Sequence, residues 1–144
     1  MFQLIKIAYG RDNVPEPMLL PAKAGVTYGV GMALRLDETD HALQIATGDV
    51  TATHIALEDK TAKAGEKLLC YQILPQMLFE APVKSGDVSS VLPGSRLQIS
   101  ADGYGISTTA ASGVTVSENK VKIAFGALVT DTAEKDNKLF IRLN

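Results

Sequence analysis

The sequence contains no tryptophan, only 6% aromatic residues and a single cysteine, Cys70, among its 144 residues. One cysteine excludes an intramolecular disulfide, and its place in the apolar run 67–74 indicates a buried, inert thiol instead of a reactive one. Few aromatic residues leave little to line a ligand cavity. No metal or disulfide is needed for stability, because a domain of this size buries roughly 70% of the surface that its unfolded chain exposes.

The chain also lacks a strong excess of either charge and any long apolar run. Its formal net charge is −2, and its 14 basic residues are scattered along the sequence. We therefore expect no nucleic-acid partner, since such proteins carry a concentrated basic patch. No apolar stretch reaches the roughly 18 residues of a membrane span, and the chain begins with a strand-like segment instead of a signal peptide. We expect a protein made in the cytoplasm, without a secretion signal and without a membrane partner.

Motifs for catalysis, metal binding and cofactor binding are missing too. The only two histidines, His41 and His54, have no cysteine or histidine partner at metal-ligand spacing. Asp37, Glu38 and Asp40 form an acidic loop, but the loop lacks the alternating ligands and fixed glycine of a calcium site. We therefore assign no catalytic, cofactor-binding or metal-binding residue, and we expect a protein that is not an enzyme.

What the sequence does contain is a series of short strand-like segments. Small and β-branched residues dominate, and turn residues separate the segments at intervals of about ten residues. No stretch of twelve residues carries helical periodicity. The sequence predicts an all-β fold, a small β-barrel or sandwich of short and mainly antiparallel strands. The expected strands are 2–8, 26–36, 41–46, 53–58, 67–74, 77–80 (an edge strand between two prolines), 96–100, 106–109, 114–116, 120–130 and 139–143.

Residues 9–25 form a proline-rich segment that we expect to be an extended N-terminal arm. Three prolines within seven residues remove backbone donors and disfavour both a helix and a central strand. Apolar residues in the arm are costly to leave in water as a patch, so they either cover the domain's own core or dock on a partner. The candidate docking residues are Arg11, Val14, Pro15, Pro17, Met18, Leu19, Leu20 and Pro21.

Two stretches of the chain, 31–45 and 92–106, share a hairpin pattern. In the second stretch a strand with Leu97 and Ile99 on one face ends at the turn Asp102-Gly103. The two hairpins are offset by 63 positions, and later matches such as Ala56 with Ala127 are offset by 71. We expect a single β domain over residues 1–144 with a possible internal repeat of 31–73 and 94–144. The alternative is that any two β-rich segments share alternation and glycines.

The order of these elements resembles the head decoration, or capsid cement, proteins of tailed bacteriophages. The resemblance covers about two thirds of the chain. The residues that carry it are Gly31-x-x-Leu34-x-Leu36, Ala42–Ala46, Ile55–Glu58, Ala64–Ile73, and the latter half from Pro93-Gly94 through Asp102-Gly103 to Leu139–Leu143.

This resemblance implies a structural virion protein that binds the outside of an assembled phage capsid and stabilises it. The implied partner is the major capsid protein, with a possible homo-oligomer such as a trimer, and the implied location is the capsid exterior. In this hypothesis the β domain bridges shell subunits and the arm is the docking strap. An alternative is a receptor- or carbohydrate-binding β module, which would need clustered exposed aromatic residues. A small hydrolase would need a pocket with perturbed carboxylates near His41 or His54.

Overall fold

The computed structural model describes residues 1–7, 15–48, 51–74, 77–85, 96–110, 127–133 and 138–143. These residues form an all-β fold without a helix, built from short and mainly antiparallel strands, which confirms the predicted fold class. No described segment is a helix that could cross a membrane. The strands are β1 (Gln3–Ile7), β2 (Met18–Pro21), β3 (Thr27–Tyr28), β4 (Ala33–Leu36), β5 (Leu43–Ile45), β6 (His54–Ala56), β7 (Lys60–Thr61), β8 (Lys67–Gln72), β9 (Met77–Ser85), β10 (Arg96–Ile99), β11 (Ile106–Ala110), β12 (Ala127–Ala133) and β13 (Lys138–Leu143).

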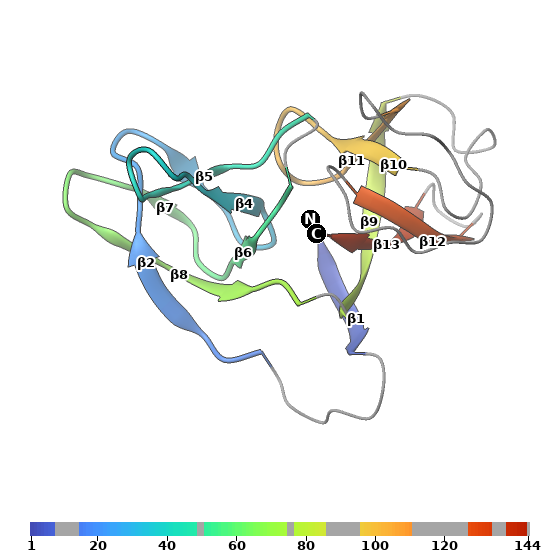
Figure 1. Cartoon of the computed structure of the whole chain (residues 1–144), viewed down its shortest axis with the longest axis horizontal. Helices are drawn as coiled ribbons and strands as arrows, with labels where there is room; N and C mark the ends of the chain where they lie inside the picture. The colour runs from blue at the N-terminus through green and yellow to red at the C-terminus, as the bar shows by residue number, and fades with distance from the viewer. Residues whose placement is uncertain are drawn as a thin grey trace.

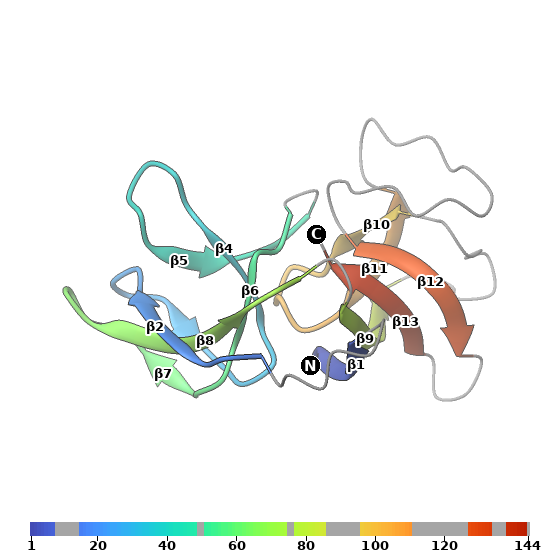
Figure 2. The ribbon, with the colours of Figure 1, turned by 60° about the horizontal axis from the view of Figure 1, so that its bottom comes forward.

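The strands form two larger sheets and one small sheet. The N-terminal sheet has the order β2-β8-β6-β4-β5, and β3 pairs with β7 beside it. The C-terminal sheet has the order β1-β9-β11-β10-β12-β13, and β13 pairs back onto β9. Figure 1 shows the N-terminal sheet on the left and the C-terminal sheet on the right, and the turned view in Figure 2 keeps them side by side.

Two apolar clusters fill the interior, and the first of them joins the sheets in a sandwich-like arrangement. Neighbouring residues of β4 face different clusters, Ala33 the first and Leu34 the second, and β6 repeats this with Ile55 and Ala56. These parts of β4 and β6 are therefore buried on both faces of the N-terminal sheet, since successive side chains of a strand point to opposite faces. The first cluster draws on both sheets: Phe2, Ala33, Ala46, Ala52, Ile55, Tyr71, Ile73, Met77, Phe79, Ala81, Leu97, Ile99 and Ile106.

The two larger sheets share one pairing pattern. In the N-terminal sheet, β4 pairs with β5 and β6, β6 with β8, and β8 with β2. In the C-terminal sheet, β10 pairs with β11 and β12, β12 with β13, and β13 with β9. The register of the hairpins agrees with the offset of 63 read from the sequence, since Leu36 faces Leu43 and Ile99 faces Ile106. In the pairing pattern, β9 therefore occupies the position in the C-terminal sheet that β2 occupies in the N-terminal sheet.

The corresponding strand pairs, β2 with β8 and β9 with β13, also match in detail. Pro21 faces Lys67 across β2 and β8, and Pro82 faces Lys138 across β9 and β13. The residue after each proline makes a parallel contact with the hairpin: Ala22 bridges to β5, and Val83 pairs with β11. The next residue is a lysine in each case, and each lysine forms an ion pair with a hairpin aspartate, Lys23 with Asp40 and Lys84 with Asp102.

One predicted match between the halves is displaced. Ala127 faces Leu97 where His54 faces Leu34, so β12 corresponds to β6 with Ala127 matching His54 and not Ala56. A shift of two residues keeps every side chain on the same face, so alternation in the sequence could not resolve it. The repeat of 31–73 and 94–144 as a whole stays a prediction, because 94–95, 111–126 and 134–137 lie outside the described residues.

The predicted edge strand at 77–80 is wrong in both length and place. Strand β9 has nine residues and is paired on both sides, with β1 along Met77–Glu80 on one edge and with β13 along Phe79–Pro82 on the other. Pro82 is tolerated because pairing with β1 ends at Glu80 and pairing with β11 begins at Val83, so the missing N–H falls between the two ladders. Strand β7 was not predicted, and the expected strand 114–116 and residues 120–126 of the next lie outside the described residues.

Candidate functional site

Part of the predicted arm belongs to the N-terminal sheet. Its residues Met18–Pro21 form β2, an edge strand paired with β8 (Figure 1). Met18 and Leu20 are half-buried and pack against the second apolar cluster, whereas Leu19 is 58% exposed. The arm therefore covers the domain's own core with one face and presents an apolar side chain to solvent with the other. Arg11 and Val14 lie outside the described residues.

Leu19 is the most exposed large apolar side chain among the residues whose burial the structure describes. It lies opposite Leu69 of β8, which is half-buried. Pro17 and Pro21 on either side of Leu19 are exposed as well, and Pro15 is half-buried. We call the exposed residues Pro17, Leu19 and Pro21 the β2 edge patch. Leu19 and Pro21 lie on the strand that the sheet holds in place, and Pro17 directly precedes it.

The backbone of β2 has a defined polarity across the strand. Ala22 donates its N–H to the Glu66 carbonyl at 3.0 Å, so even-numbered residues of β2 point their backbone groups toward β8. Across from Leu19, the Leu69 N–H donates to the Glu58 carboxylate at 2.8 Å and its carbonyl accepts from Leu57 at 2.9 Å, both away from β2. The backbone groups of Leu19 therefore face outward from the sheet.

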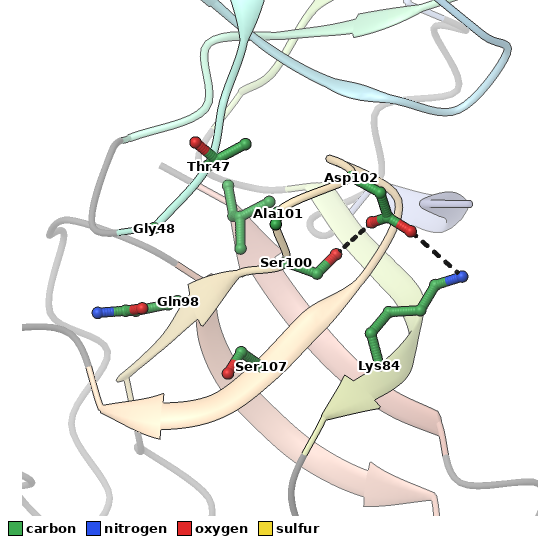
Figure 3. A pocket seen from close by; sticks show the side chains of 9 residues that line it. Thr47, Gly48, Lys84, Gln98, Ser100, Ala101, Asp102 and Ser107 are labelled. Atoms are coloured by element: carbon green, nitrogen blue, oxygen red, sulfur yellow. Dashed lines mark hydrogen bonds and ion pairs between the residues drawn. The ribbon is translucent and has the colours of Figure 1, made fainter.

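A pocket of about 530 Å³ lies between the two sheets, where the hairpin β10–β11 approaches the chain after β5 (Figure 3). Its volume is within the range of small-molecule sites. Lys84 and Asp102 are its two charged residues, and the remaining lining residues are Thr47, Gly48, Gln98, Ile99, Ser100, Ala101 and Ser107.

The polar groups at one side of this pocket are engaged with one another. Ser100 Oγ donates to Asp102 Oδ1 at 2.6 Å and accepts the Gly105 N–H at 3.0 Å, and Asp102 also accepts the Tyr104 N–H. Lys84 Nζ lies 3.6 Å from the other oxygen of Asp102. Burial raises the pKa of Asp102, but these hydrogen bonds and the Lys84 ammonium outweigh it, so the pKa is lowered overall. An ionised carboxylate of this kind is a weak general base, and the group as a whole stabilises the turn.

The same turn attaches the C-terminal sheet to the N-terminal sheet. Ala33 of β4 donates its N–H to the Gly103 carbonyl at 2.8 Å, and Gly48 and Ile99 exchange two backbone hydrogen bonds at 2.9 and 3.1 Å. The Tyr104 hydroxyl occupies the space that a side chain at Gly29 would need. The turn 100–105, which the sequence predicts as a hairpin turn, thus also forms a contact between the sheets.

The candidate metal and catalytic residues do not come together in the described residues. His41 is exposed in the loop between β4 and β5, whereas His54 is buried in β6 with Nδ1 2.9 Å from Thr53 Oγ1. Burial lowers the pKa of His54. Asp37 accepts two backbone N–H groups and the Arg35 guanidinium, and Asp40 pairs with Lys23. No group of three potential metal ligands is found in this part of the chain.

Cys70 is fully buried in the second cluster, as its apolar surroundings in the sequence predict. Burial raises the pKa of its thiol to about 11, which keeps the sulfur protonated at neutral pH. Lys84 was missed as a polar partner of Asp102, since the two residues are brought together by the parallel contact of β9 with β11. The signal that could have indicated it is the sequence Pro-x-Lys, which occurs at 21–23 and again at 82–84.

Comparison with protein-family models, with curated proteins and with solved structures found no match to this chain.

Proposed function

We propose that the protein is a structural virion protein that binds the outside of an assembled phage capsid and stabilises it. The observation that carries the proposal is Leu19, a large apolar side chain that is 58% exposed on an edge strand fixed by the sheet. Leu19 lies between the exposed Pro17 and Pro21, and a contiguous apolar patch of this kind supports a contact surface. Its position within the proline-rich arm, whose apolar residues the sequence predicts to cover the core or to dock on a partner, adds to this support.

The rigidity of the β2 edge patch suits a docking role. Three prolines restrict the backbone around Leu19, and the pairing of β2 with β8 fixes the strand, so little conformational entropy is lost on binding. On a capsid, many copies bind a repeated lattice, and oligomerisation multiplies modest contacts into avidity. The major capsid protein is the proposed partner, a homo-oligomer such as a trimer the proposed bound form, and the capsid exterior the proposed location.

The alternative functions receive less support from the described residues. A carbohydrate-binding module needs exposed rings, yet Tyr28 and Tyr71 are buried and Tyr104 packs against Gly29. Burial raises the pKa of Tyr71 to about 12, in keeping with its place in the core. A hydrolase would need a pocket beside His41 or His54, and neither residue lines the pocket between the sheets.

Co-sedimentation with undecorated heads of the phage that encodes the protein tests this proposal. Deleting the arm would remove β2 and expose the second cluster, so a point variant, Leu19→Asp, is the sharper probe. Leu36→Asp is the matched control, because Leu36 is also exposed, at 37%, but lies on β4. We expect wild type and Leu36→Asp to sediment with heads and Leu19→Asp to bind at least about tenfold more weakly, since each 1.4 kcal/mol is a factor of ten.

Failure of wild-type protein to bind heads overturns the capsid function. Undiminished binding by folded Leu19→Asp overturns the assignment of the β2 edge patch.

A further inference from the structure

We propose that Asp102-Gly103 is a modification site, at which the aspartate converts to isoaspartate when the turn 100–105 opens, and that the closed turn suppresses this reaction. This modification does not depend on a capsid partner. The pair is the only Asp-Gly in the sequence, and Asn-Gly does not occur. A glycine after the aspartate favours the reaction, because it has no Cβ to crowd the attacking nitrogen and it permits a wide range of backbone conformations.

The reaction uses only these two residues and water. The backbone nitrogen of Gly103 attacks Cγ of the protonated Asp102 side chain, the N–Cγ bond forms, and the carboxyl hydroxyl leaves with the amide proton as one water molecule. Water then opens the five-membered succinimide ring. Opening at Cγ restores aspartate, whereas opening at the main-chain carbonyl gives isoaspartate, in which the backbone runs through Cβ and Cγ of residue 102.

The backbone of the closed turn keeps the Gly103 nitrogen away from Cγ. Gly103 donates its N–H to the Ser100 carbonyl at 2.9 Å, which closes a β-turn with Ala101 and Asp102 at its centre. Neither central residue has a positive φ, so the turn is of type I, in which ψ of the second central residue is about 0°. The Asp102 nitrogen then eclipses the Gly103 nitrogen about the Cα–C bond. Ring closure needs the Asp102 Cβ in that eclipsed position, so the closed turn does not react.

The Asp102 carboxylate is held as well (Figure 3). Its Oδ1 accepts the Ser100 hydroxyl at 2.6 Å and the Tyr104 N–H at 2.9 Å, and its Oδ2 lies 3.6 Å from Lys84 Nζ. Burial raises the pKa of Asp102, but these hydrogen bonds and the Lys84 ammonium lower it overall, so the protonated form that reacts is rare at neutral pH. Opening of the turn removes the geometric and the electrostatic obstacle together.

The isomerised turn does not fit back against the N-terminal sheet. Isoaspartate lengthens the backbone before Gly103 by one carbon atom. The site has little room for this, since even a Cβ at Gly103 would lie 2.6 Å from Ile45 Cγ2. A displaced Gly103 also loses the hydrogen bond from the Ala33 N–H to its carbonyl, which is 2.8 Å long. Each isomerisation therefore weakens the junction between the sheets.

Ageing of the folded protein at neutral pH, beside a synthetic peptide of residues 97–107, tests the suppression. Trypsin releases residues 97–120, a fragment whose only aspartate is Asp102, and chromatography with mass spectrometry separates its two isomers. We expect isoaspartate to form at least about a hundredfold more slowly in the protein than in the peptide, because only the open turn reacts. Similar rates overturn the proposal.

A pair of hydroxyl deletions tests whether local opening of the turn is the route. Ser100→Ala removes the hydroxyl that holds Asp102 and the Gly105 N–H, so we expect isomerisation to become at least about tenfold faster. Thr53→Ala is the matched control, because Thr53 Oγ1 accepts the Leu36 N–H at 3.0 Å within the N-terminal sheet. We expect Thr53→Ala to leave the rate unchanged. An equal rise in both variants, or no rise in folded Ser100→Ala, overturns opening of the turn as the route.

Hydrogen exchange of the Gly103 amide in wild-type protein decides the question if Ser100→Ala does not fold. The same opening exposes this amide and permits ring closure, so we expect isomerisation to be slowed at least as much as exchange of the amide. A smaller slowing of isomerisation shows that the closed turn reacts, and overturns the proposal.

Thermal unfolding of aged samples tests the loss of the junction. We expect a second transition at lower temperature, with an amplitude that follows the isoaspartate fraction. A single unchanged transition in a largely isomerised sample contradicts a weakened junction.

Discussion

The hydroxyl of Ser100 donates a hydrogen bond to the carboxylate of Asp102, with Oγ and Oδ1 2.6 Å apart. The same carboxylate accepts the Tyr104 N–H at 2.9 Å and lies 3.6 Å from the Lys84 ammonium. One side chain thus joins the turn of the β10–β11 hairpin to the end of β9. Because this turn also contacts β4, the Asp102 carboxylate supports the junction between the two sheets.

Replacing Asp102 tests whether its carboxylate stabilises the junction between the sheets, and we expect this stabilisation to depend on pH. Asp102→Ala removes two hydrogen bonds and an exposed ion pair, so we expect the free energy of unfolding at pH 7 to fall by about 1–2 kcal/mol. The folded pKa of Asp102 is lowered from 3.8, so its contribution is present above that value and is lost as pH falls through the folded pKa. Urea unfolding of both proteins should show the difference shrinking below pH 4. An equal difference at pH 7 and at pH 3 contradicts the role of the charge.

Gly103 offers a test of how closely the turn packs on the N-terminal sheet. It has φ +74°, and a Cβ there would lie 2.6 Å from Ile45 Cγ2 and 3.0 Å from Met32 Cγ. Gly65 has nearly the same φ, +79°, but a Cβ there would meet no atom within 4 Å. We expect Gly65→Ala to cost about 1 kcal/mol for the backbone alone, and Gly103→Ala to cost at least about 2 kcal/mol more. Equal losses in thermal unfolding would show that the turn has room to move.

How far the sequence predicts this structure depends on the range of the interactions involved. Local alternation and turn residues sufficed for strands such as β10 and β13, and the hairpin register follows from turn length. The sequence did not predict that β9 is a central strand, because Pro82 suggests the end of a strand. Only the structure shows that pairing with β1 ends at Glu80 and pairing with β11 begins at Val83. Strand β7 has two residues and carries no periodicity to detect.

In the candidate site, too, local sequence predicts one part and pairing with a distant strand determines the rest. Apolar residues in the arm predicted either cover for the core or a docking surface, and pairing with β8 decides which side chains are buried and which are exposed. That pairing turns Met18 and Leu20 toward the core and leaves Leu19 outside. A sequence pattern cannot rank these three residues by exposure, because the partner strand lies about fifty residues further along the chain.

Cys70 provides a probe of opening in the N-terminal sheet. Its side chain is fully buried and its Sγ lies 3.7 Å from the Met18 carbonyl, beneath β2. Burial raises the thiol pKa to about 11, so we expect reaction with a disulfide reagent at pH 8 to be at least a hundredfold slower in native than in urea-unfolded protein. Rapid labelling of Cys70 in the native protein would contradict its burial beneath β2.

Electron cryomicroscopy of heads incubated with the protein tests directly whether the β2 edge patch docks on the capsid. We expect density for the protein on the outer surface of the capsid, with the β2 edge patch nearest the shell. Bound protein whose β2 edge patch faces solvent would contradict docking through this patch.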